Sequence, residues 1–217
     1  FNDIEILNKI YEDTVIKDIA VRHKVSNLAV LRNLYSYLIS NFASKFSYNS
    51  LKAITSINSV NTIKKFIGYL EETYFAKTIN KFDYSYKKQI VNDKKFYLLD
   101  NGFINALSKN VTKESGWLLE NLVLSNLNYG DDVFYYSNGF ECDFLVAKNR
   151  KVIEAIQVCY EFNETNKERE IKGLTSAMDN FKLNEGLILT NNQTDEINVE
   201  FGKIKVMPVW KWLLKRE

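Results

Sequence analysis

Residues 140–158, FECDFLVAKNRKVIEAIQV, contain two apolar runs that meet at a short polar segment. The runs ECDFLVA and KVIEAIQV are rich in β-branched and aromatic residues, and the KNRK between them has the polar character of a hairpin turn. The pattern therefore predicts two antiparallel strands. Asp143 lies in the middle of the first run, where a buried carboxylate without a partner would be costly, so a partner is expected for it.

The segments on either side extend this pair of strands into a larger sheet. An amphipathic helix is predicted over residues 114–130, and a further strand over 132–137. A second helix is predicted over 163–182, followed by apolar strands at 186–190 and 204–209. The order helix, three strands, helix, strand predicts an α/β (or α+β) domain with helices covering a mixed sheet.

The first half of the chain has a helical apolar period. Apolar stripes with spacings of three and four run through residues 28–42 and 62–79, and a short helix is predicted over 47–54. Residues 77–89, KTINKFDYSYKKQ, alternate between apolar and polar, which predicts a β-hairpin. A short helix, a turn, a longer helix and a basic hairpin together predict a winged helix-turn-helix. We place the helical and winged-helix region at 1–94 and the α/β domain at 95–217.

The charge is unevenly distributed along the chain. The net charge is only +2, but residues 45–95 hold ten lysines and four acidic side chains. A basic segment of this kind is a candidate surface for a polyanion such as DNA, although a solvated face of lysines would have the same composition. The lysines that we expect to contact DNA are Lys64, Lys65, Lys77, Lys81, Lys87 and Lys88.

The composition excludes several kinds of site. The chain has one histidine, so a multi-histidine metal site is excluded, and it contains neither a GxxxxGK[ST] nor a GxGxxG nucleotide-binding loop. Its two cysteines cannot form a disulfide framework. No apolar run approaches the roughly 20 residues that span a bilayer, and the first residues lack the pattern of a secretory signal. We therefore expect a cytoplasmic chain that does not act in a membrane.

Three polar side chains in the second half are candidates for a catalytic or metal site. Glu120 interrupts the apolar run LLENLVL of the first predicted helix, and Asp143 and Gln157 lie on neighbouring predicted strands. Their carboxylate and carboxamide oxygens are ligands that suit Mg²⁺, which would activate a water for phosphoryl transfer. The alternative is structural, with Asp143 paired to a lysine such as Lys151 and Glu120 at the edge of a helix face.

A helix glutamate, a strand aspartate and a polar pair on the next strand resemble the PD-(D/E)XK nucleases, which have a restriction-endonuclease-like αβββαβ domain. The resemblance implies that Glu120, Asp143 and Gln157 are the catalytic and metal-ligating positions. It also implies a lysine two residues after Gln157, where this chain has Cys159. A cysteine cannot supply the positive charge, and Lys167 or Arg169 on the following helix would have to replace it.

A longer series of segments resembles the DUF4143 region of prokaryotic AAA-type ATPases. That resemblance implies an N-terminal ATPase module outside this chain as a partner, with ATP bound only there. The segments are YLEETYFAKTINKFDYS, KKFYLLDNGFINAL, LLENLVLSNL, GFECDFLV and VIEAIQVCYEFNETNKEREIKGL.

Three hypotheses for the function follow. The first is a DNA-binding region with a winged helix and an inactive nuclease-like domain, and this is the one that the missing lysine favours. The second is an active nuclease with Mg²⁺ at Asp143. The third is a protein-interaction module that assembles with or regulates the ATPase. Self-association of the chain is left open.

Overall fold

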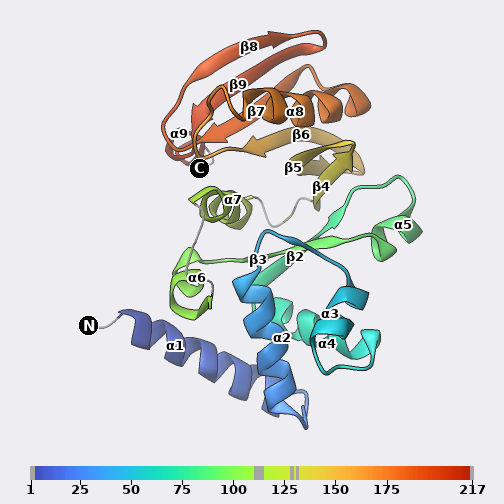
Figure 1. Cartoon of the computed structure of the whole chain (residues 1–217), viewed down its shortest axis with the longest axis vertical. Helices are drawn as coiled ribbons and strands as arrows, with labels where there is room; N and C mark the ends of the chain where they lie inside the picture. The colour runs from blue at the N-terminus through green and yellow to red at the C-terminus, as the bar shows by residue number, and fades with distance from the viewer. Residues whose placement is uncertain (1–2, 110–114, 128–129, 131, 216–217) are drawn as a thin grey trace. The chain divides into compact units, whose positions relative to one another are not determined.

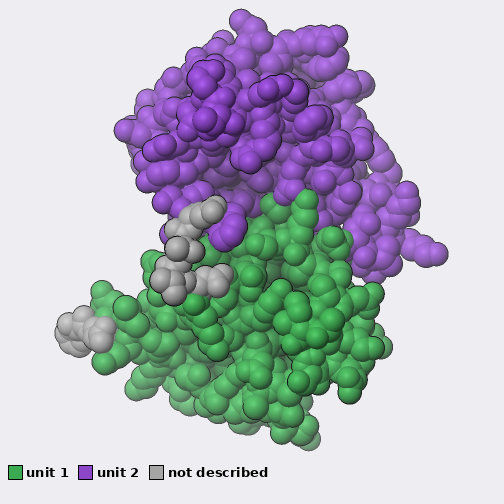
Figure 2. Space-filling view, viewed as in Figure 1, with its two compact units in different colours: residues 1–78, 93–113 green, residues 79–92, 114–217 purple. Residues whose placement is uncertain are grey.

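The computed structural model describes residues 3–109, 115–127, 130 and 132–215. The described residues include helices and both parallel and antiparallel strands, which confirms a mixed α/β chain (Figure 1). The chain forms two compact units, coloured separately in Figure 2. The first unit comprises residues 1–78 and 93–113, and the second comprises residues 79–92 and 114–217. The predicted domain division between residues 94 and 95 stays a prediction.

The helices of the first unit are arranged around the predicted apolar stripes. The stripe of the 28–42 segment is buried at Leu31, Leu34 and Leu38, and Ile63 and Ile67 are buried from the later helix. Burial of such side chains is the main term that holds these short helices in place. The helices are α1 (Asp3–Asp13), α2 (Leu28–Ser40), α3 (Tyr48–Ile54), α4 (Val60–Glu72) and α6 (Asn101–Leu107), with a π-helix, η1, at Thr14–Val21.

Three short strands accompany these helices. They are β1 (Lys45–Phe46), β2 (Ala76–Lys81) and β3 (Lys94–Leu98), and their order in the sheet is β1–β3–β2. The strand β1 runs antiparallel to β3, with Phe46 opposite Lys94. The strand β2 begins in the first unit and ends in the second.

The hairpin predicted over residues 77–89 is wrong. The segment contains β2 and then a helix, α5 (Tyr86–Val91), in place of a second strand. The helix begins after Ser85 and places Tyr86 and the two following lysines in solvent. In a short helix whose apolar side chains are exposed, no buried face sets the spacing of those side chains. An alternation over six residues therefore cannot distinguish such a helix from a strand.

The second unit has the predicted order of helix, three strands, helix and strand. The strands lie in the order β4–β5–β6–β7–β9–β8, and the pairs β4–β5, β5–β6 and β8–β9 are antiparallel, whereas β6–β7 and β7–β9 are parallel. The strand β8, at the far side of β9, was not predicted. The elements are α7 (Ser115–Ser125), β4 (Asp132–Asn138), β5 (Phe140–Lys148), β6 (Lys151–Val158), α8 (Lys167–Phe181), β7 (Glu185–Thr190), β8 (Asp195–Val199), β9 (Gly202–Pro208) and α9 (Val209–Leu213).

The turn between β5 and β6 is confirmed as a tight hairpin. Lys148 lies opposite Lys151, and the two residues between them, Asn149 and Arg150, have φ angles of 52° and 64°. Two consecutive residues with positive φ are typical of the turns whose twist matches that of paired strands.

The helix α8 lies against the sheet on a buried apolar face that includes Leu174, Ala177 and Met178. Gly173 belongs to the same face, and a Cβ built there would lie 2.0 Å from the backbone oxygen of Glu141 on β5. The close approach of helix and strand therefore requires glycine at this position. It fixes the middle of α8 beside the strand that carries Asp143.

Candidate functional site

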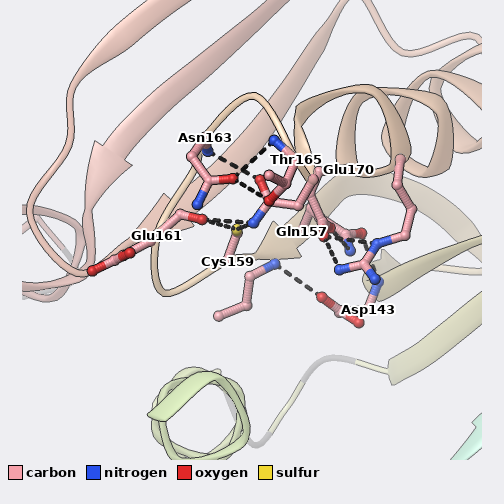
Figure 3. Close-up of polar contacts among 10 residues, drawn as sticks. Asp143, Gln157, Cys159, Glu161, Asn163, Thr165 and Glu170 are labelled. Atoms are coloured by element: carbon pink, nitrogen blue, oxygen red, sulfur yellow. Dashed lines mark hydrogen bonds and ion pairs between the residues drawn. The ribbon is translucent and has the colours of Figure 1, made fainter. Parts of the chain in front are cut away.

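The strands β5 and β6 and the helix α8 bring four polar side chains together, which we call the polar cluster: Asp143, Gln157, Arg169 and Glu170. The backbone N–H of Asp143 donates to Oε1 of Gln157 at 3.2 Å, and the N–H of Val158 donates to Oδ2 of Asp143 at 2.9 Å. These contacts cross between neighbouring strands, so the register of β5 against β6 places Asp143 beside Gln157 (Figure 3).

The helix supplies the other half of the polar cluster. Nε2 of Gln157 donates to Oε2 of Glu170 at 2.6 Å, and the guanidinium of Arg169 donates to Oε1 of Glu170 through Nε at 3.1 Å and Nη2 at 2.5 Å. Both oxygens of Glu170 and both ends of the Gln157 carboxamide are therefore engaged. Figure 3 shows Gln157 and Glu170 pointing toward one another.

An exposed arginine balances the buried negative charge of the polar cluster. Glu170 and Asp143 are 3% and 7% exposed, whereas the side chain of Arg169 is 77% exposed. The hydrogen bond and charge of Glu170 raise the pKa of Arg169, and Cys159 and Asp143 contribute in the same direction. The guanidinium thus stabilises the buried carboxylates while its own outer surface stays in water, which limits the desolvation cost of the pair.

Cys159 lies two residues after Gln157, at the position where the nuclease resemblance implies a lysine. Its thiol donates to the backbone oxygen of Glu161 at 3.0 Å and accepts from Nδ2 of Asn166 at 3.4 Å. Burial, and then the charge of Glu170, raise the pKa of this thiol to about 11. Cys159 is therefore a neutral hydrogen-bonded group at neutral pH, and the positive charge of this region comes from Arg169.

The predicted Mg²⁺ site stays a prediction, and the hydrogen bonds of the polar cluster weigh against it. Glu120 is buried on α7, but within the described ranges no three His, Cys, Asp or Glu side chains are arranged to hold a metal ion. Oε1 of Gln157 already accepts a hydrogen bond, and the second carboxylate of the cluster, Glu170, is neutralised by Arg169. A divalent cation would have to displace that guanidinium and would gain few free oxygen ligands.

Glu170 was missed by sequence reasoning. It lies in the first turn of α8, where acidic residues are ordinarily solvated. The spacing of Glu170 in the sequence could have indicated that its side chain is buried. It lies on one helical face with three residues that are also buried: Gly173, Leu174 and Ala177. A carboxylate on a buried helical face requires a donor from the opposing strand, and Gln157 is that donor.

The six predicted DNA-contacting lysines fall into two groups of three. Lys64 and Lys65 are exposed on α4, and Lys77 is half-buried on β2, in the first unit. The other three belong to the second unit, where Lys81 is half-buried at the end of β2 and Lys87 and Lys88 are exposed on α5. The six lysines are therefore divided between the two units.

The family model that matches the chain describes a domain of unknown function, DUF8612, and it matches residues 2–114. The chain belongs to the DUF8612 family. The match ends where the continuous part of the second unit begins, so the DUF8612 domain corresponds closely to the first unit together with the α5 segment.

Two curated relatives match nearly the whole chain. An uncharacterized protein of Methanocaldococcus jannaschii is 34% identical over 226 residues, and an uncharacterized protein of Haemophilus influenzae is 27% identical over 219 residues. Each alignment covers 97% of this chain but only 50% and 52% of the two relatives, so the chain spans about half the length of the proteins it matches. No solved structure matches the chain with significance.

These matches correct the predicted family. Assignment to the DUF4143 region of AAA-type ATPases is wrong, because the matching family is DUF8612 and neither DUF4143 nor an AAA-type ATPase is found. The expectation of an attached ATPase module that binds ATP rested on that resemblance and loses its basis. Within the part of the chain that the structure describes, no helix is long and apolar enough to cross a membrane.

Proposed function

We propose that this DUF8612 protein binds duplex DNA through its first unit, which we interpret as a winged helix-turn-helix. The observation that carries the proposal is the order α2, β1, α3, α4, β2, β3 combined with the strand order β1–β3–β2. A helix pair followed by two neighbouring strands is how such modules present their second helix to a groove.

The surface chemistry of α4 supports this role. Ile63, Ile67 and Leu70 anchor one face of the helix in the core, while Asn61, Lys64 and Lys65 of its first two turns are exposed. Lysine ammonium groups contact phosphates and asparagine carboxamides pair with base edges, so this face offers both kinds of contact.

We interpret the second unit as a nuclease-like αβββαβ domain that is catalytically silent. The order β4–β5–β6–β7, with β6 and β7 parallel and helices before and after, supports the first part of this interpretation. The polar cluster supports the second part, because Gln157 and Glu170 are bonded to each other and Cys159 carries no positive charge. The exposed guanidinium of Arg169 would still be able to contact a phosphate.

The test is duplex-DNA binding by the full chain over a salt series, in Mg²⁺ and in EDTA. We expect the logarithm of the affinity to fall with the logarithm of the salt concentration, by about 0.9 per neutralised phosphate. The variant Lys64→Ala/Lys65→Ala should bind more weakly with a shallower slope. The matched control, Lys148→Ala/Lys151→Ala, removes two exposed lysines from the β5–β6 turn and should leave both unchanged.

Two results would contradict the proposal. Absence of binding at moderate salt would favour a protein-interaction module. Cleavage in Mg²⁺ that Asp143→Ala abolishes would replace the silent domain by an active nuclease.

A further inference from the structure

The ring of Tyr84, between β2 and α5, is exposed but is held in place by its neighbours. Tyr84 is 78% exposed, yet its ring meets that of Phe82 edge-on, with the ring centroids 5.3 Å apart. The ring of Phe181 on α8 lies 6.3 Å away, and Nδ2 of Asn180 donates to the Tyr84 hydroxyl at 3.4 Å. Two aromatic contacts and a hydrogen bond therefore orient a ring whose surface is mostly in water.

The two rings that support Tyr84 are themselves part of the packed second unit. Phe82 meets the rings of Phe134 and Phe181 edge-on, at 5.5 Å and 4.7 Å. The ring of Tyr136 lies 5.5 Å from that of Phe181. Phe82, Phe134 and Phe181 pack against the core of this unit. Because the supporting rings are packed, Tyr84 has little freedom to lose when a ligand binds to it, which is the advantage of a preorganised site.

The segment that carries the exposed ring is positively charged. Residues 81–91 contain three lysines and one acidic side chain, which gives the segment a net charge of +2. Nζ of Lys88 is 4.0 Å from Oδ2 of Asp83, the residue before Tyr84, and the Lys88 side chain is 68% exposed. Lys87 is exposed on the first turn of α5. A polyanion is therefore the kind of partner that this segment attracts.

The chemistry of this surface favours nucleic acid over a protein partner. Tyr86, Ile90 and Val91 on α5 are also exposed, and an exposed apolar surface rimmed by polar residues marks a binding site. Protein interfaces are depleted of lysine, whereas single-stranded nucleic acids bind to exposed aromatic rings among basic side chains. The bases of a duplex are stacked on one another, so an unpaired base is the partner that fits the Tyr84 ring.

We propose that Tyr84 stacks on an unpaired base of a single-stranded nucleic acid and that Lys87 and Lys88 contact the neighbouring phosphates. Every base has an aromatic face and a lysine contacts phosphate as a point charge, so the surface binds without sequence preference. Neither contact involves the 2′-hydroxyl of the sugar, so DNA and RNA strands bind alike. This surface belongs to the second unit and takes single strands, whereas the proposed duplex binding is a property of the first unit.

The first experiment measures the affinity of the full chain for a single-stranded oligonucleotide of about 12 nucleotides, as DNA and as RNA. Tyr84→Leu keeps an apolar side chain but removes the ring, and should weaken binding of both strands by about 5- to 150-fold, the contribution of one stacked base. Tyr84→Phe keeps the ring and should retain most of the affinity, which separates stacking from a loss of the fold. Tyr74→Leu is the matched control, because Tyr74 is 72% exposed in the first unit, and should leave the affinity unchanged.

The second experiment uses the same DNA strand with abasic sites in place of its nucleotides, which keeps the phosphates. The parent should bind the abasic strand more weakly, and Tyr84→Leu should bind it as well as the parent does, because no base is left to stack. Lys87→Met/Lys88→Met should make the dependence of log affinity on log salt shallower by about 0.7 per lost phosphate contact on both strands. Lys148→Met/Lys151→Met, at the β5–β6 turn, should leave this slope unchanged.

An equal loss of affinity for the intact and the abasic strand in Tyr84→Leu would overturn the inference, as would a loss that Tyr84→Phe shares in full or one confined to RNA. Absence of binding to single strands would overturn it while leaving duplex binding intact. Absence of duplex binding alone would contradict the proposed function of the first unit and leave the single-strand site standing.

Discussion

Gln157 on β6 donates a hydrogen bond of 2.6 Å to the buried carboxylate of Glu170 on α8, while its carboxamide oxygen accepts the N–H of Asp143 on β5. One side chain thus joins two strands and a helix. A buried carboxamide in this position must have both ends satisfied, because a buried polar group without a partner costs about 1–3 kcal/mol. The pair therefore stabilises the second unit whether or not the unit contacts nucleic acid.

The first prediction concerns this pair. Gln157→Leu should lower the free energy of unfolding by about 1–3 kcal/mol, because Glu170 loses a donor and the N–H of Asp143 loses an acceptor. Glu170→Leu should also destabilise, since the Gln157 amide loses its acceptor. The double variant should cost less than the sum of the two, as expected of residues in one network. Strictly additive losses in denaturant unfolding would show that the two side chains do not act together.

The second prediction tests the approach of α8 to β5. Alanine is normally favoured over glycine within a helix by about 1 kcal/mol, but Gly173→Ala would place a methyl group 2.0 Å from the Glu141 oxygen. We expect a loss of about 1–3 kcal/mol from the displaced backbone. Gly116→Ala in α7 is the matched control, because a Cβ there has no atom within 4 Å. A gain in melting temperature for Gly173→Ala would mean that α8 lies farther from the strand.

Much of the fold could be predicted from the sequence because the larger elements bury one clear face. The helical period of α4 and the apolar runs of β5 and β6 each indicate which residues are buried in the core. The strand β8, DEINV, gave no such signal, since it lies at the edge of the described sheet beside β9 and is mostly polar. The helix α5 was mistaken for a strand for the same reason, because its apolar residues are exposed.

The sequence predicted only the part of the candidate site that lies on two neighbouring strands. The alternation of the strands and the hairpin between them were sufficient to indicate that Asp143 and Gln157 lie side by side. The role of Glu170 depends on where α8 docks, and that is set by the glycine contact and the packing of Leu174 and Met178. The helical spacing of Glu170 indicates that its side chain is buried, but it does not indicate which strand the helix packs against.

The third prediction concerns alkaline pH. Burial raises the pKa of Tyr11 and of Tyr35, whose hydroxyl donates to the backbone oxygen of Phe66 at 2.6 Å. Above about pH 10 these tyrosines ionise in the unfolded chain but not in the folded one, so the unfolded state binds fewer protons and stability falls as the pH rises. Each contributes a slope of about 1.4 kcal/mol per pH unit.

Denaturant unfolding followed from about pH 9 to 11 measures this slope. Tyr35→Phe should make it shallower by the share of one tyrosine, although the variant also loses the hydrogen bond to Phe66 at every pH. A slope that is the same in Tyr35→Phe and the parent would mean that Tyr35 is free to ionise in the folded chain.

The last prediction concerns acidic pH and Glu71. Burial raises the pKa of this carboxyl above its ordinary 4.5, and the hydrogen bond from the Thr78 N–H and the charge of Lys77 only partly oppose the shift. A raised pKa means that the folded state holds the proton more tightly, so this stabilising contribution is complete below the unfolded pKa and is lost as the pH rises through the folded pKa. Glu71→Gln keeps an oxygen for the Thr78 N–H without the charge. Its stability relative to the parent should therefore improve between about pH 4 and pH 7. Glu5→Gln, at an exposed position of α1, should show little such change in thermal unfolding at the two pH values. If Glu71→Gln instead loses stability relative to the parent as the pH rises, the charged carboxylate is favoured in the fold and Lys77 outweighs the effect of burial.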